Sequence, residues 1–348
     1  MNLYIRDRKD GSLMNWYLQS GKESDIASST RIRFSRNIKG YKFNLTKKEL
    51  QDLENKIKEN VYLIGYGLNF LKLEDMDDIT KLSLVEKGLV NFKFAFKSNN
   101  IGAILINDEE NICIMIGEDD HLKIQVFSSG LELENALNLA IEIDKKIDDI
   151  FGYSVSKQYG YLTACPNNLG TGLKASVKLH LPALAKTRNT EKVLEAINNF
   201  GINIKGVYDE EGHIVGDMYE ISNKKTLGIT ENEIIQNIKI IVEKVIKQER
   251  KARRFLANEG IEVEDLIYRN YGVLTNCRKI TMEEAQNLLS TVKLGVDLGI
   301  LKELSDLQIQ KLYLYIQPGN LQKYFGEQYE RLDREIKRAE MIKQVINQ

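Results

Sequence analysis

Four segments of the chain carry residue types that phosphoryl-transfer chemistry uses. They are the pair Arg31 and Arg33, an acidic turn at residues 118–121, a cysteine-containing segment at 165–172 and an acidic segment at 209–213. Phosphoryl transfer needs cations around the phosphates, a metal ion, and carboxylates that orient the acceptor. The sequence has neither a Gly-x-x-x-x-Gly-Lys-Ser/Thr phosphate loop nor a protein-kinase catalytic loop. An ATP-using enzyme with this sequence would therefore bind the phosphates in a different way.

The composition indicates a soluble globular protein. The 348 residues include 49 Lys+Arg and 50 Asp+Glu, and the hydrophobic fraction of 43% is enough for a large core. A net charge of -1 argues against a nucleic-acid binder that works by bulk positive charge. No apolar stretch approaches the ~18 residues of a membrane-spanning helix, so we expect a cytoplasmic location without membrane or nucleic-acid partners. Of the 49 basic residues, 35 are lysine and only 14 are arginine.

The cysteines and histidines offer no metal site by spacing. Cys113, Cys165 and Cys277 show neither a metal-binding pattern nor a disulfide framework, and we therefore expect no protein-bound metal. Cys113 lies within an apolar run and is expected in the core, and Cys277 is expected to be structural. His121 and His180 are expected to be hydrogen-bonded structural residues, without a catalytic role.

The elements that must position the candidate residues show strand and helix patterns. Arg31 and Arg33 are two positions apart within residues 28–37, which predicts a strand with both arginines on one face. Three short apolar runs after residue 100 predict an antiparallel meander. The strands of the catalytic part are expected at 28–37, 101–106, 112–116, 122–126, 160–163, 175–181, 205–208 and 218–222, with helices at 46–61, 131–151 and 190–200.

From Thr230 onward the pattern is helical only. Capping boxes begin at Thr230 and Thr281, and the final helix is expected to bury an apolar stripe. That stripe consists of Tyr329, Leu332, Ile336, Ala339 and Ile342. We therefore predict an α+β fold, in which an antiparallel β-sheet flanked by helices precedes a C-terminal α-helical domain. The predicted boundary divides the chain into a catalytic domain at 1–257 and a helical domain at 258–348.

Several motifs together resemble the ATP:guanido phosphotransferases. They occur in the family's order between residues 29 and 223 and are highly specific as a set. The motifs are Ser29-Thr30-Arg31-Ile32-Arg33, Glu118-Asp119-Asp120-His121-Leu122-Lys123-Ile124, residues 160–172 from Gly-Tyr-Leu-Thr to Gly-Thr-Gly, and Ile221-Ser222-Asn223. Helices follow the catalytic part where animal phosphagen kinases instead have a helical domain before it. With the sequence Leu-His-Leu-Pro-Ala-Leu at 179–184, this layout is similar to that of the bacterial protein-arginine kinases.

The resemblance implies a site for ATP with Mg2+ and a site for an acceptor guanidinium. The ATP-binding positions that it implies are Thr30, Arg31, Arg33, Lys123, Lys174 and Lys205. The carboxylates that hold the acceptor fall on Asp119 and Glu210, and the reactive cysteine falls on Cys165. In the family, Lys123, Lys174 and Lys205 are arginines and Asp119 is a glutamate. Lysine keeps the charge of arginine but loses its bidentate fork.

Each implied role has a physical reason. A guanidinium has a pKa above about 12, so it must lose a proton before it attacks phosphorus, and a carboxylate pair can hold it and accept that proton. Asp119 and Glu210 suit this role. A thiolate at Cys165 could orient the guanidinium charge. Aspartate is shorter than glutamate by one carbon–carbon bond, about 1.5 Å, and the neighbouring Glu118 could compensate for that loss.

The C-terminal helix carries Arg334-Glu335-Ile336-Lys337-Arg338-Ala339. This run resembles the motif with which protein-arginine kinases bind phosphoarginine away from the catalytic site, except that Glu335 replaces an aspartate. Arg334 and Arg338 are four positions apart, so they share a helix face on which two guanidinium groups could hold a phosphoryl group. An ordinary solvated helix face is the alternative.

These observations predict a protein-arginine kinase that transfers the ATP γ-phosphoryl group to arginine side chains of proteins. The resemblance also implies a zinc-binding activator protein, a Clp-type unfoldase that receives the marked proteins for degradation, and a homodimer. Two alternatives stay open. The first is a weakened or inactive homologue that acts as a phosphoarginine-binding adaptor, which is favoured by the lysines at 123, 174 and 205 and the aspartate at 119. The second is a kinase of small guanidino compounds, which would use the same site.

Overall fold

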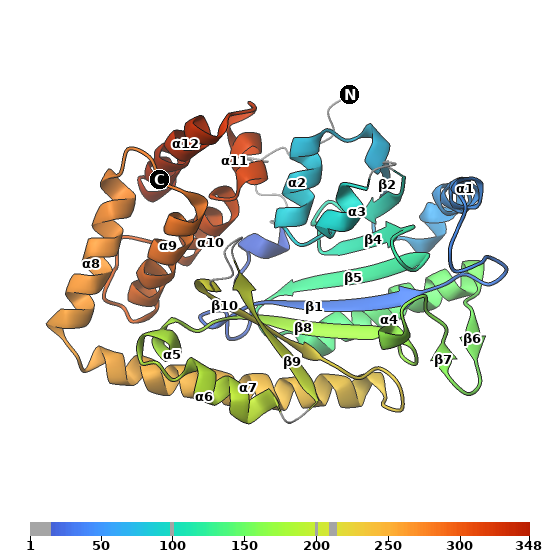
Figure 1. The fold of residues 1–348 in the computed structure, drawn as a ribbon, viewed down its shortest axis with the longest axis horizontal. Coiled ribbons are helices and arrows are strands. Elements are labelled where there is room, and N and C mark those ends of the chain that lie inside the picture. The colour runs from blue at the N-terminus through green and yellow to red at the C-terminus, as the bar shows by residue number, and fades with distance from the viewer. Residues whose placement is uncertain (1–14, 98–100, 199–200, 209–213) are drawn as a thin grey trace.

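The protein is built around one large antiparallel sheet (Figure 1). The computed structural model describes residues 15–97, 101–198, 201–208 and 214–348. Within these residues, eight strands form the sheet in the order β2-β3-β4-β5-β1-β8-β10-β9, and every neighbouring pair is antiparallel. The strands are β1 (Ala27–Arg36), β2 (Asn69–Lys72), β3 (Ala103–Ile106), β4 (Ile112–Ile116), β5 (Leu122–Ser129), β8 (Leu173–His180), β9 (Ile202–Tyr208) and β10 (Ile214–Asn223), and a separate pair is formed by β6 (Val155–Ser156) and β7 (Gly160–Tyr161).

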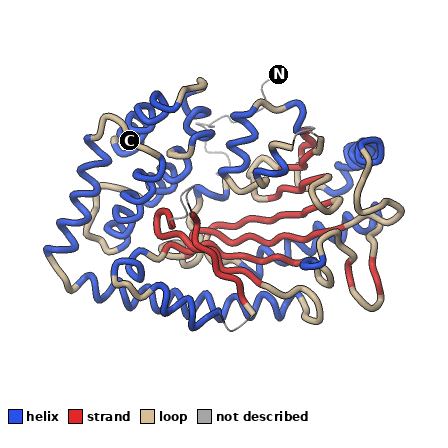
Figure 2. Tube along the Cα trace, in the orientation of Figure 1, coloured by secondary structure: helices blue, strands red, loops and turns tan. Residues whose placement is uncertain are grey.

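Helices flank the sheet and make up the whole C-terminal part (Figure 2). The helices of the first part are α1 (Lys47–Ile64), α2 (Asp78–Glu86), α3 (Phe92–Ala95), α4 (Leu133–Phe151), α5 (Pro182–Lys186), α6 (Thr190–Asn198) and α7 (Glu231–Ala257). Those that follow are α8 (Ile261–Asn276), α9 (Met282–Asp297), α10 (Asp306–Tyr315), α11 (Pro318–Phe325) and α12 (Arg331–Ile346). The predicted α+β fold is confirmed. The boundary between 257 and 258 stays a prediction, although α7 ends at Ala257.

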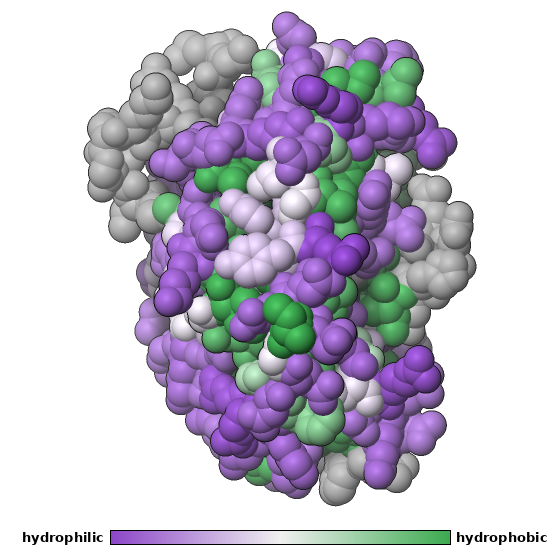
Figure 3. Space-filling view, turned by 90° about the vertical axis from the view of Figure 1, so that its left-hand side faces the viewer, coloured by the Kyte–Doolittle hydropathy of each residue, from purple (hydrophilic) through white to green (hydrophobic). Residues whose placement is uncertain are grey.

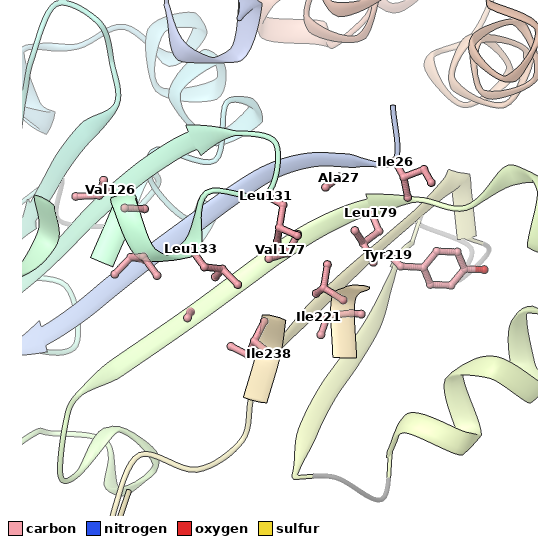
Figure 4. Close-up of a cluster of buried hydrophobic side chains, with 14 of the residues drawn as sticks. Ile26, Ala27, Val126, Leu131, Leu133, Val177, Leu179, Tyr219, Ile221 and Ile238 are labelled. Atoms are coloured by element: carbon pink, nitrogen blue, oxygen red, sulfur yellow. The ribbon is translucent and has the colours of Figure 1, made fainter. Parts of the chain in front are cut away.

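The central strand β1 separates a buried apolar face from a basic face. Ile32 and Phe34 are buried in the main core, whereas the alternate residues Arg31 and Arg33 lie on the other face of the strand. Helix α4 packs on β1 and β5, and α7 packs on β8 and β10. Figure 4 shows the core beside β1, where side chains from β5, β8, β10 and α7 converge. Burying these apolar residues fixes the register that places the arginines.

Local sequence signals define the ends of several helices. The helix predicted at 46–61 begins with a capping box: the Thr46 side chain accepts a hydrogen bond from the Glu49 backbone, and the Glu49 carboxylate accepts one from the Thr46 backbone. The same reciprocal pair occurs at Thr230 and Glu233. Each such cap satisfies backbone donors that the first helical turn leaves unpaired.

The C-terminal helices gather on one side of the sheet, on the left of Figure 1. Their surface is mostly hydrophilic, with separate apolar patches (Figure 3). They pack on the rest of the protein at several places: α9 contacts β10 and α5, α11 contacts α2, and α10 contacts the 3-10 helix at Trp16–Leu18. None of the helices in the described residues is both long and apolar enough to cross a membrane.

Buried histidine and cysteine residues occupy the positions expected of structural groups. His180 Nε2 hydrogen-bonds to the Ser290 hydroxyl at 2.8 Å, and that hydroxyl donates to Asp217 at 2.6 Å, which ties β8 and β10 to α9. Burial lowers the pKa of His180 well below its ordinary value, so the ring is neutral. Cys113 is fully buried in β4, which confirms its expected place in the core. Cys277 is half-buried at the end of α8.

Candidate active site

Strand register assembles the basic face from five neighbouring strands, β5, β1, β8, β10 and β9. Arg33 on β1 lies opposite Lys174 on β8, and Ser35 on β1 lies opposite Lys123 on β5. Because opposite residues in an antiparallel pair share a face, Lys123, Lys174, Arg31 and Arg33 all lie on the same side of the sheet. Lys205 on β9 is opposite Glu220 on β10, which is in turn opposite Lys178 on that side of β8. Five of the six predicted ATP-binding residues therefore share one face.

Thr30 does not belong to this face. The alternation that directs Arg31 and Arg33 outward turns Thr30 into the core, where it is fully buried. Its hydroxyl donates to the Gly130 carbonyl at 2.7 Å and accepts from the Glu132 backbone at 3.1 Å. The assignment of the Thr30 side chain to ATP binding is therefore withdrawn, because its hydrogen-bonding capacity is used in joining β1 to the start of α4.

Arg33 carries a buried hydrogen-bond donor that has no partner in the described part of the chain. Its Nε atom is buried and has no hydrogen-bond partner among the described residues. Burial, and then the neighbouring charge of Arg31, lowers the pKa of Arg33. An unpaired buried donor is costly, so it is a position where an anionic ligand gains binding energy. This donor set fits the phosphates of a nucleotide.

Lys174 is a half-buried cation of the face. Burial, followed by the charge of Arg33, lowers the pKa of Lys174 to about 8. Its ammonium donates to the carbonyl of Asn223 at 2.6 Å, and the Asn223 side chain bonds the backbone of β8 on both sides of Lys174. The ammonium is thus held at a fixed place beside Arg33.

Glu220 is a carboxylate within the basic face that the sequence motifs did not indicate. It forms an ion pair with Arg31 at 3.2 Å, with both side chains partly exposed. Its charge also acts on Arg33 and Lys174, whose pKa values it raises against the effect of burial. The only signal in the sequence is its position next to the Ile221-Ser222-Asn223 motif, which carries no information about charge.

The acidic turn lies at the β4–β5 connection, beside Lys123. Asp119 has a side chain that is 51% exposed and lies 3.6 Å from both Lys93 and Lys123. Glu118 is buried instead, with 7% of its side chain exposed, and forms a close ion pair with Lys123. Burial alone would raise the pKa of Glu118, but hydrogen bonds from Lys123 and from the Asp119 backbone hold it below its ordinary value.

Asp120 joins the acidic turn to two other candidate segments. Its Oδ1 atom accepts from the Asn37 side chain at 2.8 Å and from the Ala164 backbone at 2.7 Å. Asp120 is buried, so these charge-assisted bonds fix the end of β1 and the cysteine segment against the turn. His121 is structural as expected: Nδ1 accepts from the Ile38 backbone, and Nε2 donates to the Lys42 carbonyl.

Cys165 lies half-buried directly before a short 3-10 helix at Pro166–Asn168. Thr226 holds the far side of this loop by donating to the Asn167 and Leu169 carbonyls. Gly170 has a φ of +102, and a Cβ there would lie 2.3 Å from the Thr226 carbonyl oxygen. The glycine is therefore required by both backbone conformation and space.

Glu210 lies outside the described residues, as does the acidic segment 209–213 that contains it. The described strands on either side, β9 and β10, pair at Tyr208 and Ile214. In the described residues, no group of three or more His, Cys, Asp and Glu side chains could hold a metal ion.

The candidate phosphoarginine-binding residues lie on α12. Arg338 is only 3% exposed, and its guanidinium donates to the carbonyls of Ile316 and Ile280 at 2.6 and 2.9 Å. Burial, and then the charge of Arg334, lowers the pKa of Arg338 to about 10. Arg334 is more accessible and donates to the Tyr329 carbonyl at 3.3 Å. The two arginines are neighbours, but only Arg334 reaches the surface.

Comparison with known proteins identifies two matching families along the chain. The model of the ATP:guanido phosphotransferase C-terminal catalytic domain matches residues 48–252, and that of the protein-arginine kinase McsB C-terminal domain matches residues 260–348. The chain is 40% identical over 347 residues to the protein-arginine kinase of Halothermothrix orenii, and the match covers 99% of each chain. It is also 40% identical over 342 residues to the protein-arginine kinase of Bacillus licheniformis, with 96% and 93% covered.

Solved structures show the same fold. A lombricine kinase aligns with a TM-score of 0.55 and 26% identity, covering 66% of this chain and 68% of that one. The substrate-free duplicated taurocyamine kinase of Schistosoma mansoni aligns with a TM-score of 0.57 and 24% identity, covering 72% of this chain and 39% of that one.

The chain therefore belongs to the ATP:guanido phosphotransferase family. Within that family it belongs to the protein-arginine kinases, the ATP-dependent enzymes that phosphorylate arginine.

Proposed function

We propose that the protein phosphorylates arginine side chains of other proteins at the end of β1, on the basic face of the sheet. The observation that carries this proposal is the convergence of three features at that point. The basic face holds the Arg33 Nε atom, which has no hydrogen-bond partner in the described part of the chain, and the acidic turn carries the exposed Asp119. The Cys165 loop is fixed to the acidic turn and to the end of β1 through Asp120.

The basic face binds ATP through Arg31, Arg33, Lys123, Lys174 and Lys205. These side chains surround the phosphates and offset their charge, which is the main contribution that a protein makes to phosphoryl transfer. Mg2+ is expected to be held mainly by the phosphates and by water, because it is a hard cation that retains several water ligands. All five side chains contribute positive charge, but only the guanidinium groups of Arg31 and Arg33 can form bidentate hydrogen bonds to a phosphate.

The acceptor arginine is held by carboxylates. Asp119 is half-exposed, so a guanidinium on another protein can reach it without opening the structure. Together with Glu210 it would hold the planar guanidinium in bidentate hydrogen bonds and accept its proton. Cys165 would lie near the guanidinium as a thiolate that orients its charge.

The direct test uses Mg-ATP and an unfolded arginine-rich protein, with mass spectrometry of acid-labile phosphoarginine as the readout. Wild type should form phosphoarginine, and Glu210→Ala should reduce it by at least about a hundredfold, as expected when a group that orients the acceptor is lost. Asp108→Asn is a matched control, because this exposed carboxylate lies in the β3–β4 connection at the other end of β4. Its activity should equal that of wild type.

The two alternatives give different outcomes in the same experiment. A small-molecule guanidino kinase would phosphorylate free arginine but leave the unfolded protein unmodified. An adaptor would bind phosphoarginine and form none, even while ATP still binds. The buried Arg33 Nε atom has no hydrogen-bond partner among the described residues, which favours a site that binds a nucleotide.

The C-terminal helical domain, proposed at residues 258–348, is inferred to bind phosphoarginine. Arg334 would contact the phosphoryl group, and Glu335 would meet the guanidinium. Arg338 instead fixes α12 by donating to two backbone carbonyls. The phosphoryl group is therefore proposed to contact Arg334 alone, and not both arginines as the sequence suggested. Replacing Arg334 by alanine should weaken binding of free phosphoarginine without changing ATP affinity, which calorimetry can measure.

We also propose a cytoplasmic enzyme that forms a homodimer, responds to a zinc-binding activator protein and supplies marked proteins to a Clp-type unfoldase. These assignments are supported by the similarity of residues 260–348 to the McsB C-terminal domain and by the full-length similarity to protein-arginine kinases. Co-purification of the chain with a Clp-type unfoldase in the presence of phosphoarginine protein would test the last of them.

A further inference from the structure

The acidic turn is held from outside the sheet by a segment that has no assigned role. This segment runs from Leu89 to Lys97 and includes the short helix α3. The Leu89 carbonyl accepts a hydrogen bond from Gln125 on β5, and Phe94 and Ala95 are fully buried in a second core cluster. The segment is therefore anchored to β5 at Leu89 and to the second core cluster at Phe94 and Ala95.

Asn91 uses both ends of its side-chain amide. Its Oδ1 atom accepts from the Phe94 backbone at 2.8 Å and caps α3. Its Nδ2 atom donates to Glu118 Oε1 at 2.8 Å. One side chain thus connects helix α3 to the carboxylate of the acidic turn, and the amide orientation follows from both bonds, because only the oxygen can accept from Phe94.

The other carboxylate oxygen of Glu118, Oε2, also has interaction partners. It accepts from the Asp119 backbone at 2.6 Å and forms the close ion pair with Lys123. Lys97 completes the arrangement by donating to the Gly117 carbonyl at 2.5 Å. Four donors from three segments therefore fix the peptide that leads into Asp119.

We propose that Asn91 is a positioning residue of the kinase, which acts through Glu118 to hold Lys123 and the backbone of Asp119 in the geometry for phosphoryl transfer. Glu118 does not need to contact the substrate for this role. It aligns Lys123 toward the phosphates and fixes Asp119 toward the guanidinium, so one amide controls both sides of the site. The proposal rests on the proposed function in assigning Asp119 to the acceptor.

Two substitutions at position 91 separate this role from helix capping. Serine and aspartate both supply the oxygen that caps α3, so Asn91→Ser and Asn91→Asp keep the cap. Serine removes the donor to Glu118. Aspartate places a carboxylate against it. The charged groups of the described residues around this site include Lys93, Lys97, Lys123, Arg33, Asp119 and Asp120.

The expected result is a graded loss of kcat with unchanged thermal stability for Asn91→Ser. Misplacement of a catalytic group by about 1 Å costs on the order of a hundredfold, so the partial release of Glu118 should lower kcat by about tenfold. In Asn91→Asp the added negative charge raises the pKa of Glu118. The acid limb of its pH–kcat profile should therefore move to higher pH, whereas Asn91→Ser should not show this shift.

Asp77→Ser serves as the matched control. Asp77 caps α2 by accepting from the Thr80 backbone at 2.6 Å, and serine retains that cap away from the acidic turn. It should behave as wild type. If Asn91→Ser has the wild-type kcat, or if Asn91→Ser and Asn91→Asp lose activity equally with parallel drops in melting temperature, Asn91 only caps α3 and the inference is overturned.

Asp119→Asn, assayed in parallel, distinguishes the inference from the function on which it rests. If Asp119→Asn is inactive and Asn91→Ser is fully active, the inference fails while the role of Asp119 stands. If Asp119→Asn is active and Asn91→Ser is impaired with the expected pH behaviour in Asn91→Asp, the proposed role of Asp119 fails while positioning of Lys123 through Glu118 stands.

Discussion

ATP binding should weaken as the pH rises through about 8, because of Lys174. Its pKa is lowered to about 8, first by burial and then by the charge of Arg33. At pH 7 about nine tenths of this side chain is charged, and at pH 9 about one tenth. If ATP binds only the charged form, the apparent Kd increases in proportion to the loss of that form, which is about tenfold between these pH values.

Calorimetric titration of Mg-ATP without an acceptor measures this effect apart from catalysis. The phosphates of ATP are fully ionised above about pH 7.5, since their last pKa is near 6, so the ligand does not change charge over the upper part of the range. Lys174→Arg is the matched variant, because arginine stays protonated throughout. Its Kd should stay constant between pH 7 and pH 9.

Two results would refute the reasoning. A wild-type Kd that is the same at pH 7 and pH 9 would mean that Lys174 does not contact the phosphates or does not titrate in this range. An equal weakening in wild type and in Lys174→Arg would assign the pH dependence to another group. Either result would remove Lys174 from the proposed phosphate clamp.

Two further predictions concern the groups that hold the site in place. Asp144→Asn should lower the free energy of unfolding in urea by about 3–5 kcal/mol, because it leaves the buried Arg36 guanidinium without its carboxylate partner at 2.7 Å; a loss below about 1 kcal/mol would contradict this. His180 is neutral in the folded protein and ionises near 6.5 when unfolded, so stability should fall as the pH drops below about 6.5, by up to about 1.4 kcal/mol per pH unit. The slope should be smaller in His180→Asn, and an unchanged slope would count against a buried neutral histidine.

The sequence predicted the elements whose signals are local or periodic. The capping boxes marked the starts of α1 and α7, and alternation in β1 indicated that Arg31 and Arg33 share a face. The same alternation places Thr30 on the opposite face. The alternation of side chains along a strand is therefore enough to exclude the Thr30 side chain from a site that contains both arginines.

Long-range packing determined what the local patterns could not. Helix α3 has only four residues, too few to show a period, so nothing in the sequence indicated that Asn91 lies against Glu118. In α12 the expected apolar stripe was partly wrong. Leu332 and Ile336 are exposed, while Arg338 is buried because the carbonyls of other helices accept its hydrogen bonds. A charged residue can occupy a core position when its partners come from distant segments.

The excess of lysine over arginine has a defined consequence at this site. An arginine in place of Lys174 would remain charged at every physiological pH, whereas the half-buried lysine beside Arg33 does not. Lys123 is buried, but it is matched by Glu118, which Asn91 holds in place. The two lysines are therefore stabilised differently, Lys123 by a fixed carboxylate and Lys174 mainly by a backbone carbonyl. Loss of nucleotide affinity at high pH should arise from Lys174, and sensitivity to disruption of the acidic turn should arise from Lys123.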